Sequence, residues 1–227
     1  NTIGSFAYIG YDNLNKKRFA TRGVKSQIDF TWKDCSFDKD GLKKLHLASL
    51  QFRLESYVPV IEDCFVIVPQ LYGSFLFGKG AVSGKEGGWN PIFQGPVPMY
   101  PYMNNIIGGA EMGRYIDHQL PFIGMNKTSF AFNKVAIARL DFRVRVYKNH
   151  YLTAMVNYRR SSIDFKNFFR DSDVLLWSEL YDYNASNWWG AGIRYSLDTK
   201  IGPLDFDISS SNIAKNVNLY FSVGYYF

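Results

Sequence analysis

The sequence predicts an all-β fold, an antiparallel transmembrane β-barrel of which about nine strands are present. In nine segments apolar and polar residues alternate, which gives a strand one apolar and one polar face. Aromatic residues make up 18% of the 227 residues, although the mean hydropathy is slightly negative. This combination is typical of barrels with aromatic girdles and unusual for a soluble enzyme. The connections between the segments also alternate in length, as they do in transmembrane barrels.

The first half of the chain contains four of these segments. The first, at about residues 5–11, has the weakest pattern. Residues 24–32 and 48–55 alternate clearly, whereas residues 65–77 are apolar on both faces near their start. A short proline-containing turn at residues 58–63 is expected to join the third segment to the fourth.

The segment at residues 136–146 is the most informative. One of its faces is apolar, and the other carries Arg139, Asp141, Arg143 and Arg145. Burying three arginines and an aspartate in a dry core would be very costly, because charges lose their hydration there. A hydrated lumen removes that cost. We therefore expect these side chains to face a lumen.

Four segments follow, at about residues 152–159, 189–197, 204–209 and 217–227. Arg194 lies on the polar face of the second of them and is also expected to face the lumen. The last segment alternates almost without error and ends on an aromatic residue. This ending favours the hypothesis of a transmembrane barrel. Tyr225 and Phe227 are predicted to form a C-terminal strand signal.

The long connections are expected at one end of the barrel. Transmembrane barrels have short periplasmic turns and longer outer loops. If the C-terminus is periplasmic, the two longest connections both lie outside. The connections assigned to the outside cover residues 33–44, 78–133, 160–186 and 210–216.

Motifs between the strands resemble the bacterial surface antigen superfamily, the outer-membrane barrels that include BamA, TamA and the two-partner secretion transporters. Residues 12–15 and 18–23 resemble the family turn F-P-T-x-G, with Ala20 in place of proline and Gly23 at the end. Gly202, Pro203 and Leu204 belong to a match to the family signature G-P-L/I-x-F.

Residues 101–114 resemble the family's long loop that folds back into the lumen. Gly108 and Gly109 precede Arg114 at the family spacing, but the usual V-R-G-F or V-R-G-Y reads Gly113, Arg114, Tyr115, Ile116 here. The resemblance implies that the loop, about residues 78–133, enters the lumen. It also implies a charge-assisted lock between Arg114 and Asp141, with Asn157 as a second candidate.

A narrower resemblance links residues 114–124 and 148–158 to the C-terminal barrels of patatin-like phospholipases. It implies that residues 1–227 form the C-terminal part of a sixteen-stranded barrel. The implied function is the membrane anchor or translocator domain of a patatin-like phospholipase, a lipid hydrolase, in the bacterial outer membrane. A second hypothesis is an assembly or secretion factor of the same superfamily, and a third is a soluble β-barrel binding module.

Nine strands would leave two unpaired edges, which are costly in hydrocarbon. Missing N-terminal strands, or another chain, are therefore expected to close the barrel. Outer-membrane lipid and the outer-membrane assembly machinery are the other partners expected of such a barrel.

The sequence predicts no catalytic site, metal site or cofactor in this chain. The nearest approach to G-x-S-x-G, residues 80–84, has the wrong spacing, and the three histidines lie far apart along the chain. The net charge of +6 is spread over turns and alternating positions, so nucleic-acid binding is not expected. Cys35 and Cys64 are predicted at opposite ends of the barrel and therefore unpaired.

Overall fold

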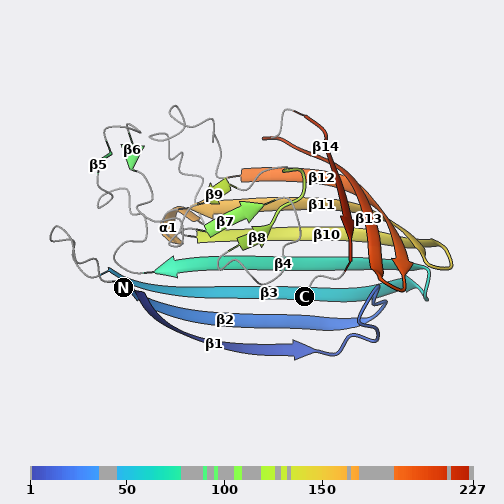
Figure 1. The fold of residues 1–227 in the computed structure, drawn as a ribbon, viewed down its shortest axis with the longest axis horizontal. Coiled ribbons are helices and arrows are strands. Elements are labelled where there is room, and N and C mark those ends of the chain that lie inside the picture. The colour runs from blue at the N-terminus through green and yellow to red at the C-terminus, as the bar shows by residue number, and fades with distance from the viewer. Residues whose placement is uncertain are drawn as a thin grey trace.

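The computed structural model describes residues 2–35, 45–77, 89–90, 95–96, 105–108, 119–125, 129–131, 134–162, 165–168, 187–213 and 216–224. Within these ranges nine strands form one antiparallel sheet (Figure 1). They are β1 (Thr2–Asp12), β2 (Gly23–Cys35), β3 (Leu45–Ile61), β4 (Phe65–Phe77), β10 (Lys134–Tyr147), β11 (His150–Ser162), β12 (Asn187–Thr199), β13 (Gly202–Ser211) and β14 (Asn218–Val223).

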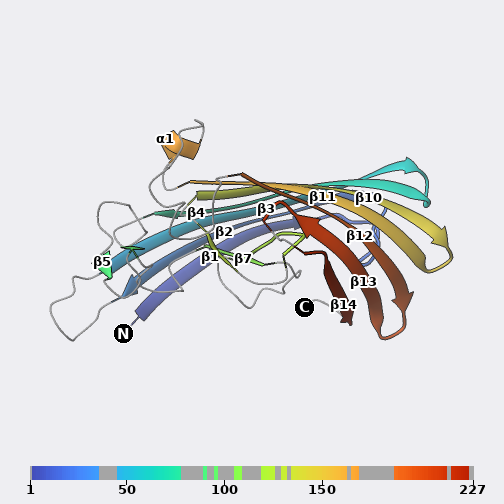
Figure 2. The same ribbon diagram turned by 90° about the horizontal axis from the view of Figure 1, so that it is seen from above.

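Each strand of this sheet pairs with the next one along the chain. The order is β1-β2-β3-β4-β10-β11-β12-β13-β14, so all nine predicted strands are confirmed and form a meander. The sheet is strongly curved and open, with β1 and β14 at its two edges (Figure 2). An open, curved meander is the architecture expected for part of a barrel wall.

The connections alternate between the two ends of the sheet, and the two longest belong to the same end, as predicted. The turns after β1, β3, β10 and β12 lie at one end, which we call the short-turn end (Figure 1). The other connections, including the one between β4 and β10, lie at the opposite end.

The short turn predicted between β3 and β4 is present, but its predicted start at residue 58 is wrong, because β3 continues to Ile61. The pairing of β3 with β4 shifts register between Pro59 and Ile61, and only residues 62–64 form the turn. A proline has no N–H for the ladder and is tolerated where pairing is irregular. The proline therefore marks a bulge in the strand, where the sequence had suggested its end.

The two faces of the sheet differ as the alternation predicted. The convex, outer face exposes large apolar side chains, while polar and charged side chains are buried on the concave, inner face. The exposed outer residues include Ile28, Phe30, Trp32, Leu50, Leu54, Leu71, Val144, Leu152, Val156, Ile193, Phe206, Ile208, Leu219 and Phe221. The buried polar residues include Ser49, Ser74, Arg139, Asp141, Thr153, Asn157, Arg159, Ser196, Asp205 and Asp207.

The connection between β4 and β10 contains short strands that the sequence pattern did not reveal. Strands β7 (Asn105–Gly108), β8 (Gln119–Pro121) and β9 (Ser129–Ala131) form a small three-stranded sheet, with β7 parallel to β8. Strands β5 (Trp89–Asn90) and β6 (Gly95–Pro96) form a separate pair. Segments of two to four residues are too short to show a period of two.

The short helix α1 (Phe165–Phe168) lies on the convex side of the sheet, opposite the small sheet (Figure 2). Its Phe165 ring lies 5.2 Å from that of Phe75 on β4. In the part of the chain that the structure describes, no helix is both long and apolar enough to span a membrane.

Cys64 is a free thiol at the short-turn end, and β2 ends with Cys35 at the other end. The side chain of Cys35 lies outside what the structure describes.

Candidate functional site

The inner wall of the sheet is built around Asp141 on β10. Its carboxylate accepts two hydrogen bonds from Arg139, Nε to Oδ1 at 2.7 Å and Nη2 to Oδ2 at 2.8 Å. Gln70 Nε2 on β4 donates a third, to Oδ2 at 2.9 Å. The side chains of Arg139 and Asp141 are only 3% and 9% exposed. The buried charges are therefore paired and hydrogen-bonded, which is what makes such burial tolerable.

A second buried pair joins β12 to β13. Arg194 donates to Asp207 through Nε at 2.7 Å and Nη2 at 2.9 Å. On the next inner positions, Ser196 Oγ donates to Asp205 Oδ1 at 2.6 Å. The sequence predicted that Arg194 faces a lumen, and in the structure it lies on the inner face of the sheet. The sequence placed Asp207 on the polar face of its segment but did not predict that it would pair with Arg194.

Arg143 and Arg145 also lie on the inner face of β10, nearer the short-turn end, and are half-buried. The guanidinium of Arg143 lies 5.7 Å from the ring centre of Phe19 and 5.6 Å from that of Tyr57. It also donates to the carbonyl of Ala20. Arg143 therefore ties the β1–β2 connection to the wall.

The β1–β2 connection, residues 13–22, crosses to strands that are distant in the sheet order. Arg18 pairs with Asp198 on β12 and donates to the carbonyl of Thr199 at 3.0 Å. The ring of Phe19 stacks on that of Tyr151 on β11, with centroids 4.0 Å apart. We call residues 13–22 the strap, because they span the inner side of the sheet at its short-turn end.

In each of the two family turn motifs, a glycine with positive φ allows a second stretch of backbone to lie against it. Gly23 has φ +118°, and a side chain there would collide with the backbone of Asn13. Gly202 also has φ +118°, and a side chain there would collide with Gly224. Pro203 accepts a hydrogen bond from Gly224 N at 3.0 Å. Leu204 follows on the outer face, opposite Val223 of β14.

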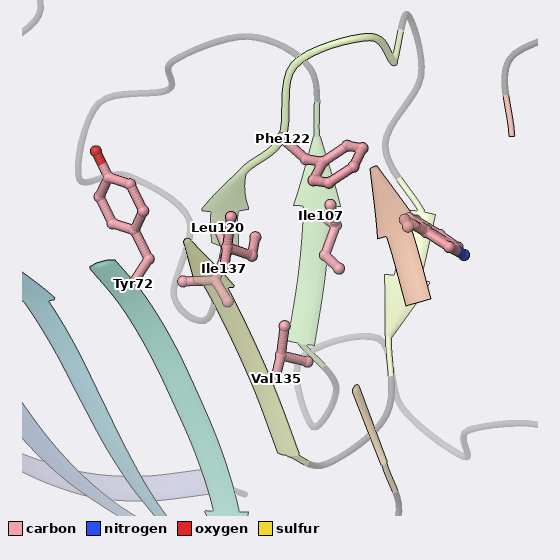
Figure 3. Packing of buried hydrophobic residues seen from close by; sticks show 7 residues of the cluster. Tyr72, Ile107, Leu120, Phe122, Val135 and Ile137 are labelled. Carbon is pink, nitrogen blue, oxygen red and sulfur yellow. The ribbon is translucent and has the colours of Figure 1, made fainter. Parts of the chain in front are cut away.

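The small sheet β8-β7-β9 is held on the inner wall by an apolar cluster (Figure 3). Its members come from both partners and are almost completely buried. They are Tyr72, Val135, Ile137 and Trp188 from the wall, and Ile107, Leu120 and Phe122 from the docked segment. The part of the inner wall that contains these four wall residues, at the end of the sheet opposite the short-turn end, is therefore a hydrophobic docking surface.

Residues 121–125, which continue from β8, contact the wall through their backbone. The carbonyl of Gly124 accepts hydrogen bonds from Ser211 Oγ and Asn218 Nδ2, both at 2.8 Å. A side chain on Gly190 would place its Cβ 2.2 Å from the carbonyl oxygen of Ile123. The glycine therefore allows the docked backbone to lie directly against β12.

Asn157 lies on β11 between Arg139 and Gly190 and is 4% exposed. Neither its Oδ1 nor its Nδ2 has a hydrogen-bond partner among the described residues. A buried amide is rarely left unpaired, so this position is suited to accept a further contact.

The loop residues predicted for the lock lie mostly outside the described residues. This holds for Gly109, Gly113, Arg114 and Tyr115, and also for Tyr225 and Phe227 at the C-terminus. Gly108 is buried at the end of β7, and its carbonyl accepts a hydrogen bond from Phe122 N at 2.9 Å. The predicted pair between Arg114 and Asp141 stays a prediction.

The described residues bring together no group of three or more His, Cys, Asp or Glu side chains that could hold a metal ion. Their inner wall can instead bind and hold a segment of chain. A network that the sequence did not predict lies on β3 and β4. Tyr57 Oη donates to Glu55 Oε2 at 3.2 Å, and Tyr72 Oη lies between Gln70 Oε1, to which it donates, and Glu55. Glu55 lies on the polar face of its segment in the sequence pattern, and this position could have predicted that it faces the inner side of the sheet.

A family model described as the OMP85 superfamily matches residues 95–227, more than half of the chain. Among solved structures, the chain is similar to BamA from Haemophilus ducreyi lacking POTRA domains 1-3, with a TM-score of 0.59 and 16% identity. The match covers 96% of this chain and 40% of that one, so this chain spans less than half of that structure. At this identity the similarity concerns the fold. No match was found among curated proteins.

Proposed function

The chain belongs to the OMP85 superfamily, and from this we propose that it is the membrane anchor or translocator part of a patatin-like phospholipase of the bacterial outer membrane. The observation that carries the membrane part is the contrast between the faces of the sheet. The outer face exposes many large apolar side chains, whereas the inner face buries polar side chains that include two arginine–aspartate pairs. Such a sheet suits lipid outside and water inside.

The phospholipase part of the proposal is supported by the resemblance of residues 114–124 and 148–158 to the barrels of that family. In this proposal the barrel has no chemistry of its own. It holds a hydrolase domain at the membrane, and N-terminal strands or another chain complete the wall. Tyr225 and Phe227 would present the last strand to the outer-membrane assembly machinery.

We further propose that the whole segment 78–133 is a lumen-entering loop. The docking of residues 105–108 and 119–125 on the inner wall supports this. Arg114 would complete the lock on Asp141 or on the unpaired amide of Asn157. Asp141 already accepts three hydrogen bonds, so Asn157 offers the more open position.

The second candidate is an outer-membrane assembly or secretion factor. It is favoured by the similarity of the fold to BamA, a likeness that extends over 96% of this chain. A soluble binding module is disfavoured, because its outer face would expose a large apolar patch to water.

The deciding experiment uses the full-length protein purified from outer membranes. Hydrolysis of a fluorogenic phospholipid, together with covalent labelling by a fluorophosphonate probe, supports the phospholipase proposal. Depletion of the protein from cells is the second arm. If other outer-membrane proteins decline on depletion and the purified protein neither hydrolyses lipid nor reacts with the probe, the phospholipase proposal is replaced by the assembly factor.

A further inference from the structure

We propose that the outer surface around His150 binds one phospholipid with an anionic headgroup, taken from the periplasmic leaflet. Val146, Tyr147, His150, Leu152 and Tyr195 line an open depression of about 420 Å³, and its lining is almost entirely apolar. It lies at the short-turn end of β10, β11 and β12, which in this class of barrel is the periplasmic end.

The walls of the depression are held in place by aromatic contacts. The imidazole of His150 lies 5.9 Å from the ring of Tyr147 and 5.9 Å from that of Tyr195, measured between centroids. His150 Nδ1 and the hydroxyl of Tyr195 are 2.5 Å apart and share a hydrogen bond. The hydrogen bond pairs the polar atoms of His150 and Tyr195 with each other, while Val146 and Leu152 supply the apolar floor for an acyl chain.

A cation stands at the rim of this depression. Lys148 is exposed in the β10–β11 turn, with its Nζ 5.3 Å from the ring centre of Tyr147. None of the carboxylates in the described part of the chain pairs with it. The nearby Asp198 is paired with Arg18 of the strap. A phosphate at the headgroup level would therefore meet the positive charge of Lys148.

The same turn is fixed relative to its neighbour strand. The carbonyl of Asn149 accepts a hydrogen bond from Asp198 N at 2.8 Å, and Lys148 has φ +29°. These features fix the backbone from which the Lys148 side chain extends beside the aromatic rim. The combination of an acyl-sized apolar floor, aromatic walls at the membrane boundary and one cation fits a phospholipid better than a soluble anion.

The test is native mass spectrometry of the full-length protein extracted from outer membranes and offered equal amounts of phosphatidylglycerol and phosphatidylethanolamine. We expect one phosphatidylglycerol to be retained in preference. Leu152→Trp fills the floor and should lower its retention about tenfold. The matched control is Val156→Trp, on the outer face of the same strand but outside the depression, which should leave retention unchanged.

Lys148→Ala should lower the preference for phosphatidylglycerol about fivefold, the factor expected for one cation near an anionic headgroup. This surface change tests the site without altering packing. Excess glycerol 3-phosphate, which lacks acyl chains, should not displace the lipid.

The proposal is overturned by equal retention in Leu152→Trp and Val156→Trp, by an unchanged preference in Lys148→Ala, or by displacement with glycerol 3-phosphate. A dimer that disappears in Leu152→Trp would assign the surface to a second copy instead. The lipid site rests on the proposed function, which places the sheet in the outer membrane. Extraction of the protein from outer membranes tests that insertion separately, so the lipid site can be disproved while membrane insertion stands.

Discussion

The inner face of β10 changes character along its length. Val135 and Ile137, near the end of the sheet opposite the short-turn end, are fully buried beneath the small sheet. Arg139 and Asp141, the next two inner positions, are buried within a network of charges. One strand face therefore serves first as an apolar docking surface and then as a polar wall. Alternation specifies which side chains share a face, but what covers that face decides how each part is stabilised.

The largest effect is expected in the polar part of the wall. Asp141→Ala would leave Arg139 buried without its carboxylate and should lower the free energy of unfolding by about 3–5 kcal/mol. The measurement is guanidinium unfolding of the purified full-length protein in detergent micelles, followed by tryptophan fluorescence.

The control for that prediction removes both charges. The double variant Arg139→Met with Asp141→Leu should recover most of the loss, because no unpaired charge remains. If the single variant is no less stable than Val144→Ala on the outer face of the same strand, the carboxylate does not hold the wall together.

In the apolar part, Ile137→Ala should cost about 2–4 kcal/mol, because it removes buried contacts with the docked segment and leaves a cavity. Hydrogen exchange should show faster exchange in residues 105–108 and 119–125. The matched variant is Ile193→Ala on the outer face, where the side chain is 55% exposed. Equal exchange in the two variants would argue against docking through this cluster.

Substituting one glycine on the inner face and one on the outer face tests whether the docked segment depends on close backbone contact with the wall. Gly190→Ala would force its Cβ against the backbone carbonyl of Ile123, and we expect a loss of about 1–3 kcal/mol and a displaced segment 121–125. The measurement is limited proteolysis within that segment.

The control is Gly73→Ala on the outer face, where the three atoms nearest to the added Cβ all belong to the ring of Phe52. A ring can rotate away, so cleavage of residues 121–125 should stay as slow as in the unchanged protein. Rapid cleavage in both variants would show that Gly190 has no special role in docking.

The sequence predicted the polar wall well and the docking surface poorly, for a physical reason. Charged residues at alternate positions of a strand avoid a large desolvation cost only on a face where they are hydrated or paired. The sequence could therefore place Arg139, Asp141 and Arg194 on the inner face. Val135 and Ile137 share that face, but apolar residues on an inner face are informative only once the covering segment is known. The covering strands are two to four residues long and leave no periodic signal.

The sequence pattern also could not predict contacts between strands that are not neighbours in the sheet. The family turn motif predicted a turn with Gly23 at its end, yet nothing in the spacing showed that Arg18 would meet Asp198 or that Phe19 would stack on Tyr151. Pairings between residues more than a hundred positions apart depend on the curvature of the sheet, which period-two alternation does not encode.

The smallest effect is expected in the strap, where the charges are partly exposed. Arg18→Ala removes a pair whose side chains are 36% and 28% exposed, so the loss should be about 1 kcal/mol or less. Guanidinium would screen the pair, so urea unfolding at low and high salt is the measurement, and the loss should shrink at high salt. Lys16→Ala, which removes a pair that is 50% exposed on both sides, should cost less still. A loss for Arg18→Ala as large as that for Asp141→Ala would mean that the strap, as much as the buried wall, holds the short-turn end together.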